Sequence, residues 1–205
     1  MTIKAAVFDL DGVFVDSCEW HHVSLNQALK EIINYEIPDD EHYKIYNGLP
    51  TKKKLEILFE KGIILDRELF LPIETIKQQK TDLCIIENSK IQYKQIALIE
   101  ELKKQGLLVG CFTNCMRKVA ELILDKAGIL DLLDYLVTNQ DVINPKPSPE
   151  GYFKCIEFFK LQPSDCCIIE DSPKGLEAAR ATGAKVIAVK NETEVNLDLL
   201  ERILK

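Results

Sequence analysis

Acidic, hydroxyl and basic side chains follow the ends of four short apolar runs in this sequence. They are Asp9 and Asp11 after the first run, Thr113 and Asn114 after the second, Lys146 in the loop after the third, and Glu170 and Asp171 after the fourth. In a parallel α/β sheet the carboxyl ends of the strands lie at one edge, and ligands bind there. Carboxylates, a hydroxyl and an ammonium gathered at one edge could hold a divalent cation and a phosphoryl group together.

Asp9 and Asp11 are two residues apart, so both side chains share one face if the strand geometry continues through them. Gly12 permits a sharp turn directly afterwards. One carboxylate could attack phosphorus and form an aspartyl-phosphate, which divides a hydrolysis into two easier steps. The other could protonate the leaving oxygen and then deprotonate the attacking water. The same Asp-x-Asp-Gly pattern also occurs in ordinary turns.

Asp171 supplies a third carboxylate for a metal site. Mg²⁺ takes a few oxygen ligands and keeps several waters, so Asp9, Asp171 and the carbonyl of Asp11 would be a sufficient protein contribution, with Glu170 acting through water. The alternative for Glu170 and Asp171 is simple charge complementarity with the helix that Ser172 caps. That alternative does not explain why the acids follow a buried strand.

Lys146 stands among alternating prolines in Asn144-Pro145-Lys146-Pro147-Ser148-Pro149. The prolines restrict the backbone and hold the ammonium in one place, where it would offset the charge of a phosphoryl group and of neighbouring carboxylates. Thr113 and Asn114 precede a helix, whose free N–H groups suit phosphate oxygens. Helix capping is the alternative role for these two residues.

Apolar runs and helical patterns alternate along most of the chain. The expected strands are residues 3–8, 107–112, 135–137, 166–169 and 185–189, and the expected helices between them are 93–105, 118–127, 151–159 and a segment that starts at Pro173 and stops before Gly183. This alternation predicts an α/β fold, a doubly wound parallel sheet covered by helices on both faces.

Residues 16–88 interrupt the alternation, because they show helical periodicity and no convincing buried strand. The helical patterns cover 20–33, 40–46, 51–60 and 66–86. So long an insert cannot be a plain crossover, so we expect a separate helical cap domain at 16–88. Residues 1–15 and 89–205 would then form the core that carries the chemistry.

The composition excludes several classes of protein. The chain has 205 residues, 33 acidic and 26 basic, with a formal net charge of −7, and it lacks the basic stripe of a nucleic-acid binder. Its apolar runs are far shorter than the ~20 residues that cross a membrane. The N-terminus lacks the apolar segment of a secretory signal, and the seven cysteines are an odd number, so we expect a cytoplasmic protein with reduced thiols.

Four ordered segments of the chain resemble the motifs of the haloacid dehalogenase superfamily. They are Phe8-Asp9-Leu10-Asp11-Gly12-Val13, Phe112-Thr113-Asn114, Lys146-Pro147-Ser148-Pro149 and Ile169-Glu170-Asp171-Ser172. The resemblance implies that Asp9 is a nucleophile, Asp11 an acid/base, Thr113 and Lys146 phosphate ligands, and Asp171 with Asp9 ligands of Mg²⁺. The helical insert looks like the cap of the subgroup that contains phosphoglycolate phosphatases and β-phosphoglucomutase.

Two segments of the expected cap also resemble substrate-facing parts of that subgroup. Glu19-Trp20-His21 is similar to a segment in which the histidine lies over the active site, and Lys52 follows a loop similar to one that approaches substrate. His21 as an ordinary helix residue, and Lys52 as part of a solvated face, are the alternatives.

The sequence therefore predicts a Mg²⁺-dependent phosphatase whose partner is a small-molecule phosphate ester, not nucleic acid or a membrane, acting as a monomer or homodimer. A phosphomutase that returns the phosphoryl group to a sugar hydroxyl is the first alternative. A non-catalytic phosphate-binding protein is the second, although that interpretation predicts the loss of a catalytic group.

Overall fold

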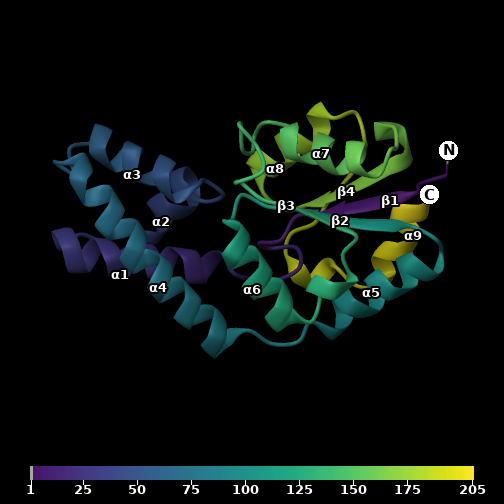
Figure 1. Ribbon diagram of the computed structural model, residues 1–205, viewed down its shortest axis with the longest axis horizontal. Coiled ribbons are helices and arrows are strands. Elements are labelled where there is room, and N and C mark those ends of the chain that lie inside the picture. Colours follow the sequence, from purple (N-terminus) through teal and green to yellow (C-terminus); the bar gives the residue numbers. More distant parts are fainter. Residues whose placement is uncertain (1) are drawn as a thin grey trace. The chain divides into compact units, whose positions relative to one another are not determined.

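The computed structural model describes residues 2–205, which form two compact units (Figure 1). The sheet unit contains the residues up to Asp16 and Lys90–Lys205, and the helical unit is Ser17–Ser89. Each boundary lies one residue beyond the position expected from the sequence.

A five-stranded parallel sheet is the centre of the sheet unit. The strands are β1 Ala5–Phe8, β2 Leu108–Phe112, β3 Tyr135–Val137, β4 Cys166–Glu170 and β5 Lys185–Ala188, in the order β3-β2-β1-β4-β5. The chain leaves β1 in the middle, builds one side of the sheet through β2 and β3, and then crosses back to build the other. This is the doubly wound fold that the alternating pattern predicts, and the prediction is confirmed.

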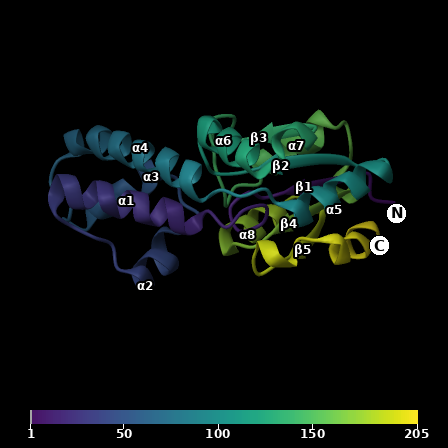
Figure 2. The ribbon, with the colours of Figure 1, turned by 90° about the horizontal axis from the view of Figure 1, so that it is seen from below.

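Helices cover both faces of this sheet, as Figures 1 and 2 show. They are α5 Tyr93–Lys104, α6 Arg117–Ala127, α7 Glu150–Phe158, α8 Pro173–Ala181 and α9 Leu200–Leu204. α7 contacts β2 and β3 while α8 contacts β4 and β5, on the face opposite α5 and α9. All four residues of β1 are fully buried, as expected for a central strand covered on both faces.

The helical unit contains α1 Cys18–Ile33, α2 Asp39–Glu41, a π-helical turn His42–Tyr46, α3 Thr51–Glu60, a 3₁₀ turn Arg67–Leu69 and α4 Phe70–Asn88. α1 packs along α4, and the core between the helices includes Leu25, Leu29, Tyr46, Leu55 and Ile73. Within the described residues of this unit there is no strand, in agreement with the helical periodicity of the insert.

Two details of the fold differ from the sequence-based expectation. The segment expected as one helix over 40–46 is an α-helical turn followed by a π-helical turn. The short helix α9 was not identified, although Leu199 and Ile203 are buried against the sheet unit.

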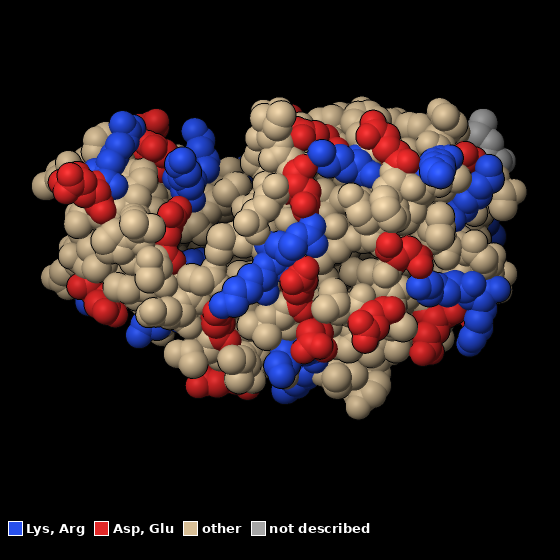
Figure 3. Space-filling view, viewed as in Figure 1, with Lys and Arg blue, Asp and Glu red and all other residues tan. Residues whose placement is uncertain are grey.

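Across residues 2–205 no helix has the length and apolar character that a membrane span requires. On the face drawn in Figure 3, acidic and basic side chains are interspersed.

Candidate active site

The parallel register brings the ends of β1, β2 and β4 side by side. Phe8 pairs with Cys111 on one side and with Ile169 on the other. Asp9, which follows Phe8, therefore lies between the end of β2 and Glu170. Asp9 is 6% exposed, and its backbone N–H donates to the carbonyl of Ile169 at 3.0 Å.

Lys146 reaches this edge from the loop after β3 and is 5% exposed. Its ammonium Nζ donates to Asp9 Oδ1, and to Glu170 Oε2 at 2.7 Å. Burial opposes the charged form of a lysine, but the two carboxylates outweigh it and raise the pKa of Lys146 above its ordinary value. Lys146 is therefore an ammonium that bridges two carboxylates.

Glu170 accepts hydrogen bonds at both of its carboxylate oxygens. Its Oε1 accepts from the backbone N–H of Asp171 at 2.9 Å, and from the backbone N–H and the hydroxyl of Ser172 at 3.0 and 3.1 Å. Its Oε2 accepts from Lys146 and from the Tyr152 hydroxyl, each at 2.7 Å. Burial opposes ionisation, yet Lys146 and these donors lower the pKa of Glu170, so the group is a carboxylate that holds Lys146.

Asp9, Glu170 and Asp171 carry more negative charge than Lys146 balances. One carboxylate oxygen of each residue lies within 4.8 Å of those of the other two. Burial, followed by the repulsion of Glu170, raises the pKa of Asp9 well above its usual range and that of Asp171 to about 8. Asp171 Oδ1 is buried and has no hydrogen-bond partner among residues 2–205. An uncompensated group of hard oxygen atoms fits a divalent cation.

Gly12 allows the first loop to pass close to this group. It has a φ of 87°, in the left-handed region, and a Cβ at this position would overlap the carboxylate of Asp171. The glycine that the sequence analysis assigned to a sharp turn is therefore also required by the approach of the loop to Asp171.

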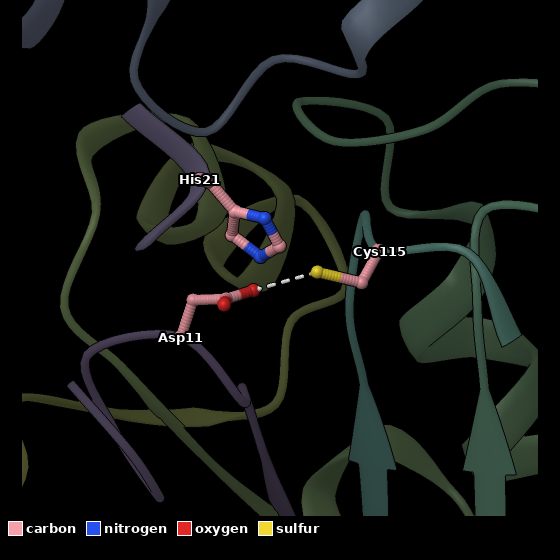
Figure 4. Close-up of side chains that lie close together, drawn as sticks. All are labelled: Asp11, His21 and Cys115. Carbon is pink, nitrogen blue, oxygen red and sulfur yellow. Dashed lines mark hydrogen bonds between the residues drawn. The ribbon is translucent and has the colours of Figure 1, made fainter. Parts of the chain in front are cut away.

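Asp11 is held by two side chains from the loop after β2. The hydroxyl of Thr113 donates to Asp11 Oδ2 at 3.2 Å, and the thiol of Cys115 donates to the same oxygen at 3.1 Å. Figure 4 shows the thiol directed at this carboxylate. Cys115 was not among the residues expected at the site, because the seven cysteines were interpreted only as reduced thiols. Its position two residues after Thr113, at a strand end, was the available signal.

Asn114 connects two loops of the site. Its amide Oδ1 accepts from the backbone N–H of Lys146 at 3.0 Å, and its Nδ2 donates to the Lys146 carbonyl at 3.4 Å. The side chain that the sequence analysis expected to bind substrate thus fixes the backbone of Lys146.

In the helical unit, the basic residues that could face a substrate differ in their burial and contacts. His21 Nδ1 lies 3.3 Å from Lys77 Nζ. Lys52 is exposed, whereas Lys54, two residues further along α3, is 6% exposed and Lys77 on α4 is 9% exposed. Lys54 and Lys77 were not singled out from the sequence, because helical periodicity alone does not tell which lysine of a run is buried.

The chain belongs to the haloacid dehalogenase-like hydrolase family, whose sequence profile matches residues 6–189. It is similar to the validoxylamine A 7'-phosphate phosphatase of Streptomyces hygroscopicus subsp. limoneus, with 27% identity over 183 residues, 88% of this chain and 82% of that protein. It is 23% identical over 207 residues to the β-phosphoglucomutase of Bacillus subtilis, covering 98% and 89% of the two chains. The family resemblance seen in the sequence is confirmed.

The fold is also similar to a crystal structure of β-phosphoglucomutase from Clostridium difficile. The TM-score is 0.84, with 19% sequence identity over 98% of this chain and 96% of that one. At this identity the likeness supports the fold, a parallel sheet with an inserted helical unit.

Proposed function

We propose that the protein is a Mg²⁺-dependent phosphatase that hydrolyses a phosphate monoester of a small metabolite through an aspartyl-phosphate on Asp9. The observation that carries the proposal is the buried cluster at the carboxyl edge of the sheet, where one ammonium bridges Asp9 and Glu170 and Asp171 Oδ1 lacks a partner. The membership in a hydrolase family, and relatives with phosphatase names, support the same reaction class.

In the first step a carboxylate oxygen of Asp9 attacks phosphorus, and the bond from phosphorus to the ester oxygen breaks. Asp11 gives its proton to that oxygen, so the substrate leaves as an alcohol. In the second step Asp11 takes a proton from a water molecule, which attacks phosphorus and releases inorganic phosphate and free Asp9. Thr113 and Cys115 hold Asp11 Oδ2, which keeps this carboxyl at a fixed place through both steps.

Lys146 would offset the charge of the phosphoryl oxygens while Glu170 and Asn114 hold it in place. Asp9, Asp171 and the carbonyl of Asp11 are the groups that would hold Mg²⁺. When bound, Mg²⁺ would supply positive charge that offsets the charge of the carboxylates and of the phosphoryl group.

The proposal is tested with Asp9→Asn, which removes the nucleophile and keeps the side-chain volume. We expect the purified wild-type protein with Mg²⁺ to release phosphate from at least one member of a panel of phosphate esters, and Asp9→Asn to release none at a similar thermal midpoint. The matched control is Asp125→Asn, an exposed position on α6, which should be as active as wild type. Turnover by Asp9→Asn would refute the mechanism, and no wild-type turnover would favour the non-catalytic alternative.

A phosphomutase is the second candidate, favoured by the similarity to β-phosphoglucomutase and by the His21–Lys77 contact in the helical unit. It would use the same aspartyl-phosphate but return the phosphoryl group to a sugar hydroxyl. Incubation with a hexose 1-phosphate and a trace of the bisphosphate separates the two. Accumulation of the 6-phosphate indicates a mutase, and accumulation of free phosphate indicates a phosphatase.

A further inference from the structure

Tyr152 is a fully buried residue in the first turn of α7, just beyond the loop that carries Lys146. Its ring lies 5.0 Å from Lys146 Nζ, and the ring of Phe112 lies 4.9 Å from the same atom. The two rings meet edge to face, with centroids 5.0 Å apart at 88°. The Lys146 ammonium thus contacts two aromatic rings and two carboxylates, an arrangement that stabilises a buried cation.

The hydroxyl of Tyr152 contacts the same network from the other side. It donates to Glu170 Oε2 at 2.7 Å, and this is the oxygen to which Lys146 donates at 2.7 Å. Burial, followed by the charge of Glu170, raises the pKa of the Tyr152 hydroxyl well above its usual value, so the group stays a donor. One carboxylate oxygen is therefore shared by a phenol and an ammonium.

This sharing determines how strongly Glu170 attracts Lys146. With the phenol present, part of the hydrogen-bonding capacity of Oε2 is taken up by Tyr152, and the ammonium divides its bonds between Glu170 and Asp9. Without the phenol, Lys146 would be the one remaining side-chain donor to this oxygen among residues 2–205, and the ammonium would be drawn toward Glu170 and away from Asp9. The position of Lys146 at Asp9 thus depends on Tyr152, whose hydroxyl donates to Glu170.

We propose that Tyr152 is a positioning residue, whose hydroxyl and ring hold the Lys146 ammonium against Asp9 for phosphoryl transfer. The inference rests on the proposed function and deepens it, because it assigns a residue that the sequence motifs do not contain.

Two glycines give this network the space that it needs. A Cβ on Gly151, next to Tyr152, would overlap the ring of Phe112, and a Cβ on Gly175 in α8 would overlap the carboxylate of Glu170. Neither glycine has a positive φ, so the backbone does not require glycine at either position. The close approach of Phe112 and Glu170 is what excludes a side chain there.

The test is Tyr152→Phe, which keeps the ring and removes only the hydroxyl. A hydrogen bond to a charged group is strong enough that we expect kcat to fall about tenfold, while KM stays within about threefold. The matched control is Tyr46→Phe in the helical unit. Tyr46 is equally buried, and its hydroxyl also contacts a glutamate and a lysine, Glu41 at 3.5 Å and Lys61 at 3.2 Å. Both variants should show similar thermal midpoints, but only Tyr152→Phe should lose kcat.

A second variant tests whether Tyr152 acts through Glu170. In a Glu170→Gln background, Tyr152→Phe should lower kcat by less than twofold further, because the shared carboxylate is already absent. Wild-type kcat in Tyr152→Phe, an equal loss in Tyr46→Phe, or a full tenfold loss in the Glu170→Gln background would each overturn the inference. If the wild-type protein turns over and Asp9→Asn does not, such a result removes the role of Tyr152 alone. Absence of wild-type turnover removes the proposed function as well.

Discussion

His42 is a buried titratable residue outside the candidate active site. It begins the π-helical turn of the helical unit, is fully buried, and stacks on His22 with ring centroids 3.8 Å apart. Neither of its ring nitrogens has a hydrogen-bond partner among residues 2–205. Burial, with the nearby charge of Lys54, lowers its pKa to about 3, so the folded ring is neutral.

The depressed pKa of His42 predicts that acid destabilises the helical unit. Above pH 6.5 the ring is neutral in both the folded and the unfolded chain, so it contributes no pH dependence. Below pH 6.5 the unfolded chain takes up a proton that the folded chain does not, and the free energy of unfolding falls by at most about 2 kcal/mol between pH 6.5 and 5. Thermal unfolding at pH 7 and pH 5 measures this loss.

His42→Leu should unfold with a smaller difference between pH 7 and pH 5 than wild type, since leucine has a similar volume and no proton to bind. Gln27→Ala is the control, because Gln27 is an exposed residue of α1 with no titrating group, so the difference should stay unchanged. An unchanged difference in His42→Leu would show that another group controls the acid sensitivity.

At this scale the sequence predicted the residues that stand at strand ends. Asp9 and Asp171 were recognisable because each lies just after an apolar run, and Lys146 because it stands among alternating prolines. Tyr152 and His42 were not, because their roles come from burial against segments distant in the sequence. Periodicity predicts which face of an element is buried, but it does not predict which polar atom on that face meets a charge.

At the scale of elements, α8 shows which parts of a helix the sequence determines locally. Ser172 caps the helix, with its hydroxyl accepting from the Gly175 N–H at 3.1 Å, and Pro173 occupies the first position. Both features were predicted, because capping depends on neighbouring residues. The need for a glycine at position 175 was not predictable, because it arises from the close approach of the Glu170 carboxylate on β4.

For Gly175→Ala, helix propensity and the packing around Glu170 predict opposite changes in the free energy of unfolding. In an ordinary helix this change is stabilising by up to about 1 kcal/mol. Here the new Cβ would overlap the Glu170 carboxylate, so we expect a loss of about 1–3 kcal/mol in the free energy of unfolding and a lower kcat. Denaturant unfolding and kcat measure the two effects. Glu177→Ala, at an exposed position of the same helix, should change neither, and a stabilised Gly175→Ala would contradict the packing described for Glu170.

In the other elements too, features set by neighbouring residues were predictable from the sequence, and features set by tertiary packing were not. The strands were predictable because each is a short apolar run followed by turn residues, and the parallel order follows from the alternation with helices. The π-helical turn at His42–Tyr46 was not predictable, since its register depends on placing Tyr46 in the core of the helical unit. Helix α9 is short, and its burial against the sheet unit is a tertiary effect.

At the scale of the whole molecule, some of the acidic residues that make the net charge negative are concentrated at one edge of the sheet. The formal net charge is −7, and three of the carboxylates lie within 4.8 Å of one another at the sheet edge, with one ammonium among them. Such a concentration of charge disfavours the folded state unless a cation or protons neutralise it. Without metal, protons do so, and the raised pKa of Asp171 reflects this.

The last prediction concerns the joint effect of Mg²⁺ and pH on stability. Because the pKa of Asp171 is raised to about 8 in the folded chain, below that pH the folded protein holds a proton that the unfolded chain has lost. Raising the pH toward 8 therefore weakens the metal-free fold through this group, whereas Mg²⁺ binding, which must displace the proton, becomes stronger by at most about tenfold per pH unit. The increase in thermal midpoint on adding Mg²⁺ should be larger at pH 8 than at pH 6.

Asp171→Asn removes one of the carboxylates that would hold Mg²⁺, so its response to Mg²⁺ should be smaller than that of wild type at both pH values, while the surface variant Asp125→Asn should respond as wild type does. NaCl at matched ionic strength separates metal binding from general screening of the acidic chain. Equal Mg²⁺ responses at pH 6 and pH 8 in the wild-type protein, or a wild-type response in Asp171→Asn, would show that the cation binds elsewhere. The larger response at alkaline pH would instead mean that the acidic cluster, unfavourable to the fold by itself, is stabilised by the ion that the proposed reaction requires.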